Sequence, residues 1–182
     1  MKTYENSIKE IIYTEEEIKT RVAEIGKQIT KDYNGEDLVV VGVLRGSIVF
    51  MADLIRYIDL PVVLDTVALS SYYNGTDSTG KVKINKDLES SITGKHVLIV
   101  EDIADRGVTL TFLIEMLQVR KAKSINICTL LNKPSRRTIE VKLDYVGFDI
   151  DDHFVVGYGL DFAQKYRNYP HIGILKEEMY KE

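Results

Sequence analysis

Short apolar runs recur along the chain and are separated by longer stretches in which apolar positions repeat every three or four residues. Runs of this length, rich in β-branched residues, favour strands that are buried on both faces of a sheet. The longer stretches have the spacing of helices that bury one face. Strands are predicted at residues 38–44, 61–69, 97–100, 124–131 and 144–150. Their alternation with helices predicts an α/β domain with a doubly wound, mainly parallel central sheet.

Three stretches predict helices. The first follows Thr14, which forms a capping-box pattern with Glu17, and ends near residues 33–35. Further helices are predicted at about 48–57 and at 110–120. Ahead of the first helix, Ile8, Ile11 and Ile12 predict a short strand or edge segment.

The composition is that of a globular domain: the chain has 182 residues, of which 45% are hydrophobic and 29% charged. Its net charge of −4 argues against binding to nucleic acid or to an anionic membrane. The single cysteine, Cys128, cannot form an internal disulfide, which fits a reducing compartment. The sequence contains neither a signal-peptide core nor an apolar run long enough to span a membrane. We therefore expect one domain, residues 1–182, in the cytoplasm.

The stretch with the clearest chemistry runs from residue 96 to residue 117. Its apolar run is followed by Glu101 and Asp102, then by a loop that contains Gly107, and then by the helical spacing. Ligands of open α/β sheets bind beyond the carboxyl ends of the strands. The N–H groups at a helix start attract anions, above all phosphate. The stretch therefore predicts a phosphate-binding site.

A third acid, Asp105, lies inside this loop, where its carboxylate would repel phosphate. Its position is understandable if the carboxylate takes a proton during a reaction. Glu101 and Asp102 suit the hydroxyls of a sugar or a Mg²⁺ ion. The alternative interpretation is that the acids are solvated and only cap a strand and a helix.

A second strand–turn–helix unit contains Arg45 and Gly46 at its turn. Gly46 allows backbone N–H groups to approach an oxyanion closely, and Arg45 could pair with that anion. Taken alone, such a turn is more often only a tight connection. Residues 70–83 are small and polar, which predicts a hairpin tip or a lid. Arg136 and Arg137 are predicted to lie on a solvated face.

Residues 97–110, VLIVEDIADRGVTL, resemble the phosphoribosyl-diphosphate-binding motif of the type I phosphoribosyltransferases, in the form found in hypoxanthine-guanine phosphoribosyltransferases. The resemblance extends from about Val39 to Gly173. The chain departs from the motif at Arg106, where the family usually has Thr or Ser, and at Ala104, where it usually has a bulkier aliphatic residue. The resemblance implies the type I phosphoribosyltransferase fold, with a core of roughly 36–150 and a small hood from about 1–15 and 151–182.

The resemblance also implies a role for each candidate residue. Asp105 would be the general base. The ribose and its 5′-phosphate would be held by Glu101, Asp102, Asp105, Arg106, Gly107, Val108 and Thr109. The diphosphate would be held by Arg45, Gly46 and Arg167, at a turn with a non-proline cis peptide bond. The purine would be held by Lys133, Phe154 and Val155, under a lid that contains Ser71 and Tyr72. Mg²⁺ would be held by Glu101, Asp102 and Asp161.

The implied activity is purine salvage: 5-phosphoribosyl passes from phosphoribosyl diphosphate to N9 of hypoxanthine or guanine, in a Mg²⁺-dependent homodimer or homotetramer. Lys133 can only donate hydrogen bonds, which favours a 6-oxopurine over adenine and leaves xanthine open. An alternative of another class is a regulator of the same fold that binds RNA. Asp105 and the acidic balance of the chain argue against that regulator. No G-x-G-x-x-G follows the first strand, which argues against a dinucleotide-dependent oxidoreductase.

Overall fold

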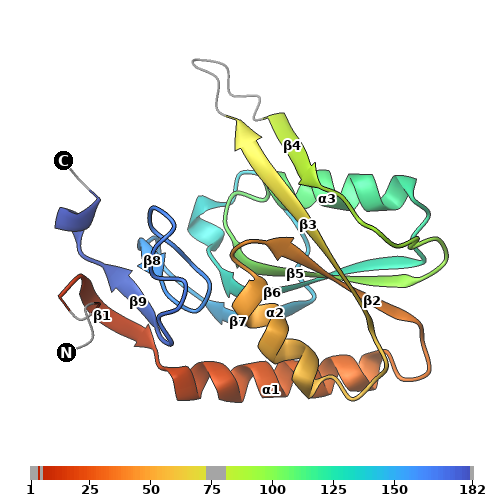
Figure 1. Cartoon of the computed structure of the whole chain (residues 1–182), viewed down its shortest axis with the longest axis horizontal. Coiled ribbons are helices and arrows are strands. Elements are labelled where there is room, and N and C mark those ends of the chain that lie inside the picture. The colour runs from red at the N-terminus through yellow and green to blue at the C-terminus, as the bar shows by residue number, and fades with distance from the viewer. Residues whose placement is uncertain (1–3, 5, 73–80, 181–182) are drawn as a thin grey trace.

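The computed structural model describes residue 4 and residues 6–72 and 81–180. Its main body is a six-stranded sheet with the strand order β4-β3-β2-β5-β6-β7 (Figure 1). The strands are β2 (Leu38–Leu44), β3 (Val63–Tyr72), β4 (Lys81–Lys86), β5 (His96–Ala104), β6 (Ser124–Asn132) and β7 (Tyr145–Asp149). All neighbours are parallel except β4, which is antiparallel to β3. The prediction of a mainly parallel sheet is confirmed.

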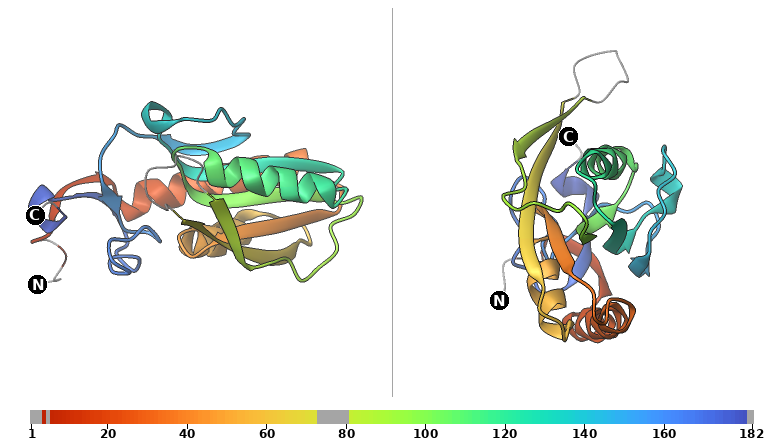
Figure 2. Two further views of the ribbon diagram at one scale, coloured as in Figure 1. Left: turned by 90° about the horizontal axis from the view of Figure 1, so that it is seen from above. Right: turned by 90° about the vertical axis from the view of Figure 1, so that its right-hand side faces the viewer.

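Helices cover both faces of this sheet, which explains why the central strands are apolar throughout. Helices α1 (Glu15–Asp32) and α2 (Ile48–Leu54) lie on one face, and α3 (Val108–Val119) lies on the other (Figure 2). In β2, Val40 packs with residues of α1 and α2, whereas Val39 and Val41 pack with residues of α3. Within the described part of the chain, no helix combines the length and apolar character needed to cross a bilayer.

The sequence signals for α1 are confirmed in detail. The Thr14 hydroxyl accepts a hydrogen bond from the Glu17 amide, and the Glu17 carboxylate accepts one from the Thr14 amide. The apolar positions at helical spacing are all buried: Ile18, Val22, Ile25 and Ile29. The helix ends at Tyr33, as predicted from the stop signal that follows it.

The two ends of the chain form a second, smaller sheet beside the main one (Figure 1). It contains β1 (Ile8–Tyr13), β9 (Ile172–Leu175) and β8 (Val155–Val156), all antiparallel to their neighbours. The loop after β8 lies at the carboxyl end of β2, where Gly159 packs directly against the carbonyl group of Gly46. The hood predicted by the resemblance is therefore present and adjoins the turn after β2.

The strands extend further than their apolar runs. Strand β5 continues past residue 100 because its backbone pairs with β6 as far as Ala104 and Asn132. Glu101 and Asp102 therefore belong to the end of the strand rather than to the loop after it. Strand β3 continues to Tyr72 because β4, which was not predicted as a strand, pairs with it. The helix predicted at about 48–57 ends as α2 at Leu54 and continues as a 3₁₀ turn, Ile55–Tyr57.

Candidate active site

A cleft of about 660 Å³ opens at the carboxyl ends of β2 and β5 and at the start of α3. Parallel strands end at the same edge of a sheet, so the loops that follow them meet there. The predicted site residues that line the cleft are Gly46, Glu101, Asp102, Asp105, Arg106, Gly107, Val108 and Thr109. The structure therefore brings together the acidic pair, the phosphate loop and the turn after β2.

The loop between β5 and α3 is bound from behind by the segment 133–139. Three successive carbonyl oxygens, those of Ala104, Asp105 and Arg106, accept hydrogen bonds from this segment. The Arg137 guanidinium supplies two of these bonds, at 2.8 Å to the Asp105 oxygen and 3.0 Å to the Ala104 oxygen. In a trans peptide the N–H points opposite to the carbonyl. The three amides that follow these carbonyls therefore point away from the segment, on the side of the loop that lines the cleft.

The start of α3 adds to this cradle of amides. Gly107 caps the helix with a φ of 87°, a conformation that favours glycine, and a Cβ there would overlap the carbonyl oxygen of Ile139. The amides of Val108 and Thr109 lie in the first turn, where no intrahelical acceptor exists. The helix dipole also favours an anion at this end. This backbone geometry suits an anion, and phosphate binding there stays a prediction.

The prediction that Arg136 and Arg137 form a solvated face is wrong for Arg137, whereas Arg136 is 40% exposed. Arg137 donates to the two loop carbonyls and also to the Asn132 side chain, and these contacts are partly buried. Arg136 lines the cleft and lies within ion-pair distance of Asp105. A pair of arginines in a polar segment resembles surface charge in the sequence, and only the tertiary structure shows which carbonyls and carboxylates they meet.

Asp105 carries a carboxylate oxygen that is buried yet has no hydrogen-bond donor among the described residues. The Arg136 Nε lies 3.6 Å from this Oδ1, which is an ion pair rather than a hydrogen bond. The Asp105 side chain as a whole is 38% exposed and lines the cleft, so a ligand N–H can approach the carboxylate from that side.

Buried Glu101 and half-buried Asp102 form an acidic pair at the end of β5. Glu101 is 8% exposed, and burial together with the neighbouring Asp102 charge raises its pKa well above its ordinary range. Burial also raises the pKa of Asp102. Two adjacent carboxylates in such an environment favour a cation or hydroxyl donors beside them. Both predicted roles, ribose binding and Mg²⁺ binding, fit this chemistry.

Asp161, the third predicted metal ligand, already has a cationic partner. Its carboxylate lies 2.7 Å from the Arg167 guanidinium and accepts a hydrogen bond of 2.8 Å from the Gln164 amide. Across residues 6–72 and 81–180, no three Asp, Glu, His or Cys side chains gather as a metal-binding cluster. Mg²⁺ is often held by one or two carboxylates together with substrate phosphates and water, so Glu101 and Asp102 suffice to fit it. A role for Asp161 at the metal stays a prediction.

The turn after β2 contains a cis peptide bond between Leu44 and Arg45, as the resemblance implied. Gly46 packs so closely that a Cβ there would coincide with the Asp102 carboxylate. The Gln164 side-chain oxygen accepts hydrogen bonds from Arg45, in the turn after β2, at 3.2 Å and from Arg167 at 3.3 Å. The two cations predicted to bind diphosphate are thus brought together by Gln164, which sequence reasoning missed.

The predicted purine-binding residues lie where β6 ends beside the hood. Lys133 is 8% exposed, and its ammonium donates to the His153 carbonyl at 2.7 Å. Phe154 follows His153 and is 39% exposed, with one ring face stacked on Tyr180 at 4.8 Å. Val155 is buried in β8. The structure therefore places these three residues together, with Phe154 still accessible to a ligand.

The predicted lid residues Ser71 and Tyr72 end strand β3, where their backbones pair with Val82 and Lys81 of β4. The rest of the predicted lid, residues 73–80, lies outside the described residues. A lid over the cleft therefore stays a prediction.

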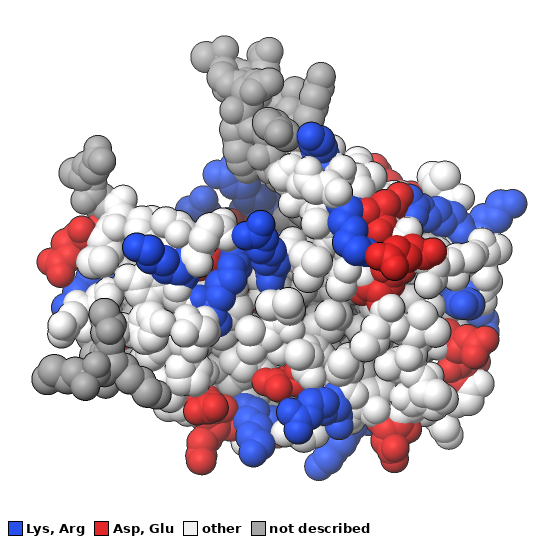
Figure 3. Space-filling model, viewed as in Figure 1, with Lys and Arg blue, Asp and Glu red and all other residues white. Residues whose placement is uncertain are grey.

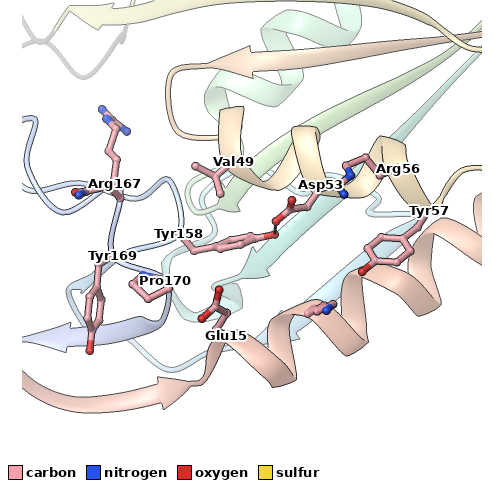
Figure 4. Close-up of a pocket in the computed structure, with 11 residues that line it drawn as sticks. Glu15, Val49, Asp53, Arg56, Tyr57, Tyr158, Arg167, Tyr169 and Pro170 are labelled. Carbon is pink, nitrogen blue, oxygen red and sulfur yellow. Dashed lines mark hydrogen bonds between the residues drawn. The ribbon is translucent and has the colours of Figure 1, made fainter.

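A second cavity, of about 510 Å³, lies between α1, α2 and the loop that carries Arg167 (Figure 4). Within it, the Tyr158 hydroxyl donates a hydrogen bond of 2.7 Å to Asp53 of α2. Burial and this hydrogen bond raise the pKa of the Tyr158 hydroxyl. Arg167 borders the cavity, but its guanidinium extends away from it (Figure 4). The contacts in this cavity fix the hood loop to the main body.

Comparisons with known proteins agree with this geometry. Residues 9–163 match the family model described as the phosphoribosyl transferase domain. The hypoxanthine-guanine phosphoribosyltransferase of Bacillus subtilis is 49% identical over 176 residues, which are 97% of this chain and 98% of the relative. That of Staphylococcus aureus is 53% identical over 175 residues, which are 96% of this chain and 98% of the relative. The chain belongs to the hypoxanthine-guanine branch of the phosphoribosyltransferase family.

Solved phosphoribosyltransferase structures have the same fold. A hypoxanthine phosphoribosyltransferase from Staphylococcus aureus superposes with a TM-score of 0.96 and 51% identity over 100% of both chains. One from Trypanosoma cruzi, solved as a ternary substrates complex, has a TM-score of 0.91 and 40% identity over 96% of this chain and 99% of that one. In the bifunctional protein TilS/HprT of Listeria monocytogenes, 48% identical over 177 residues, this phosphoribosyltransferase chain spans 27% of the relative. The predicted family and the type I phosphoribosyltransferase fold are confirmed.

The raised pKa of Glu101 leads to a prediction about how the stability of this phosphoribosyltransferase varies with pH. Because the folded state raises the pKa of Glu101 above its ordinary 4.5, the folded chain holds more protons than the unfolded chain above that pH. The neutral Glu101 carboxyl therefore contributes its full share of folding stability at acidic pH. That contribution is lost as the pH rises through the raised pKa. We expect Glu101→Gln to raise the Tm of the metal-free protein near neutral pH and to leave it unchanged at about pH 4.

The measurement is a thermal melt across this pH range in the presence of EDTA. The matched control is Glu10→Gln, at an exposed position of β1, which should show no pH-dependent gain. A Glu101→Gln variant that melts below the parent near neutral pH would contradict the burial of an unfavourable charge.

Proposed function

We propose that the chain transfers 5-phosphoribosyl from phosphoribosyl diphosphate to N9 of hypoxanthine or guanine, giving IMP or GMP and diphosphate. The names of its relatives support this activity. The observation that carries it is the Asp105 carboxylate, whose buried oxygen lacks a donor beside a cradle of backbone amides. A phosphate group would use the amides, and the N–H of a purine would use the carboxylate.

The contacts of the cleft support a role for each part of the sugar phosphate. The 5′-phosphate would be bound by the amides from Asp105 to Thr109 and by the Thr109 hydroxyl. The Arg106 side chain, exposed at the cleft, would add a charge-assisted contact where the family usually offers a hydroxyl. Glu101 and Asp102 would accept hydrogen bonds from the ribose hydroxyls.

The leaving diphosphate would meet the cations that Gln164 brings together, Arg45 and Arg167, and the backbone at Gly46. We propose Mg²⁺ as the cofactor, with Glu101 and Asp102 as its protein ligands, because their buried charges fit a cation. Bound Mg²⁺ would neutralise charge on the diphosphate as the bond to C1′ breaks.

The purine would lie between the cleft and the hood. Phe154 would stack on the ring, since Tyr180 covers its other face. Backbone at Val155 would meet an edge of the ring. Lys133 would donate to the 6-oxo group, and Asp105 would accept the N7 proton as N9 attacks C1′. Because the C1′ cation-like state reacts with water, the predicted lid would exclude solvent.

Two alternatives have different support. A preference for xanthine fits the same contacts, because xanthine also has a 6-oxo group. An RNA-binding regulator would require a continuous basic surface. On the face shown in Figure 3, basic side chains are interrupted by acidic and uncharged ones. We therefore propose small-molecule substrates without nucleic-acid or membrane partners.

We also propose a homodimer or homotetramer in the cytoplasm, where the fully buried Cys128 suits a reducing environment.

The activity is tested by diphosphate release from phosphoribosyl diphosphate with hypoxanthine, guanine, xanthine or adenine, with and without Mg²⁺. We expect turnover with hypoxanthine and guanine, none with adenine, and none without Mg²⁺. Asp105→Asn should turn over roughly 100-fold more slowly or worse, since it cannot take the proton. Faster turnover with xanthine would favour the first alternative. RNA retained on a filter, with no diphosphate released, would favour the second.

Lys133 is tested separately by Lys133→Met, which keeps the length of the side chain and removes its donors. Losing a charged hydrogen bond of about 1.5–3 kcal/mol should lower kcat/KM for hypoxanthine roughly 10- to 100-fold. The KM for phosphoribosyl diphosphate should change little, because Lys133 does not line the phosphate cleft. Unchanged kcat/KM for hypoxanthine would remove Lys133 from purine recognition.

A further inference from the structure

Arg136 lies between two parts of the site that are far apart in the sequence, the loop that contains Asp105 and the purine pocket that contains Lys133. It ends the 3₁₀ turn Pro134–Arg136 directly after Lys133, and its amide donates to the Lys133 carbonyl at 3.3 Å. Its guanidinium lies between two carboxylates. The Nε is 3.6 Å from Asp105 Oδ1, and the Nη1 is 3.6 Å from Asp152 Oδ1.

Asp152 is shared with the lysine of the purine pocket. The Lys133 ammonium lies 3.5 Å from the same Asp152 oxygen that faces Arg136. Four side chains therefore form a row of alternating charge: Asp105, Arg136, Asp152 and Lys133. The row ends at Asp105, the proposed proton acceptor, and at Lys133, the proposed donor to the 6-oxo group. In a 6-oxopurine, O6 and N7 lie next to each other on one edge of the ring, so these two groups would serve the same edge.

We infer that Arg136 is a positioning residue, which orients the Asp105 carboxylate toward N7 of the purine and connects it, through Asp152, to the Lys133 that binds O6. The inference rests on the proposed function. Since Asp105 Oδ1 has no hydrogen-bond donor among the described residues, the charge of the Arg136 guanidinium 3.6 Å away biases the direction of the carboxylate. Without that charge the carboxylate is free to rotate, and a misplaced proton acceptor slows the reaction.

This role differs from two simpler ones. Arg136 is 40% exposed and its ion pairs are long, so the pairs contribute little to folding stability. A merely structural arginine would change the Tm and all substrates alike. An arginine that binds phosphate directly would change the KM for phosphoribosyl diphosphate. A positioning arginine changes kcat, and its effect depends on how readily the purine releases its proton.

The experiment compares Arg136→Met and Arg136→Lys with the wild-type chain in steady-state kinetics. We expect Arg136→Met to lower kcat with hypoxanthine roughly 10- to 100-fold, with the KM for phosphoribosyl diphosphate changed less than about twofold. Arg136→Lys, which restores the charge, should recover part of kcat. With 8-azahypoxanthine, whose ring N–H is more acidic, the loss in Arg136→Met should be smaller. The Tm should stay within about 2 °C of the wild type.

The matched control is Arg120→Met, which removes a half-buried arginine paired with Asp87 at the opposite end of α3 from the cleft and should keep wild-type kcat. If the wild-type chain releases no diphosphate, the proposed function fails and the inference fails with it. If the wild type is active and Arg136→Met equals Arg120→Met, only the inference fails. An Arg136→Met variant that raises the KM for phosphoribosyl diphosphate, or that loses the same factor with both purines, also overturns the positioning role.

Discussion

The site depends on three peptide carbonyls, at residues 104–106, that are held from behind by the segment 133–139. Carbonyls in that position satisfy their hydrogen bonds away from the cleft, and the opposite side of the loop then presents only N–H groups. Arg137 is central to this arrangement, because its planar guanidinium binds two of the carbonyls at once. With its carbonyls held in this way, the loop offers backbone N–H groups to the cleft, which fits the proposed phosphate site.

The same edge of the sheet holds three acids beside the proposed phosphate site. Glu101 is buried and Asp102 half-buried at the end of β5, where their raised pKa values reflect the cost of charge. Asp105 faces Arg136, which comes from the segment after β6. Apart from Arg106, the positive charges thus come from elements remote in sequence. The central motif supplies amides and carboxylates, and its neighbours supply the cations that make the combination workable.

Sequence reasoning succeeded where one local pattern determines the outcome. Strand β2 has the predicted bounds, and the Thr14 capping box forms as expected. It failed where tertiary contacts decide, as when strand β5 ran past its apolar residues because β6 continued beside it. Arg137 resembles solvated charge in the sequence, because nothing local indicates that its partners are backbone carbonyls 32 or more residues away. Nothing in the sequence around Gln164 indicates that it accepts hydrogen bonds from Arg45 and Arg167, because this role depends on the two arginines lying side by side.

The most direct measurement is a crystal structure of the chain with IMP bound. We expect phosphate oxygens about 2.7–3.2 Å from backbone amides of residues 105–109, with the carbonyls behind them still held by Arg137. We also expect the purine N7 beside the Asp105 carboxylate. A nucleotide whose phosphate lies elsewhere, for example in the cavity between α1 and α2, would contradict the account.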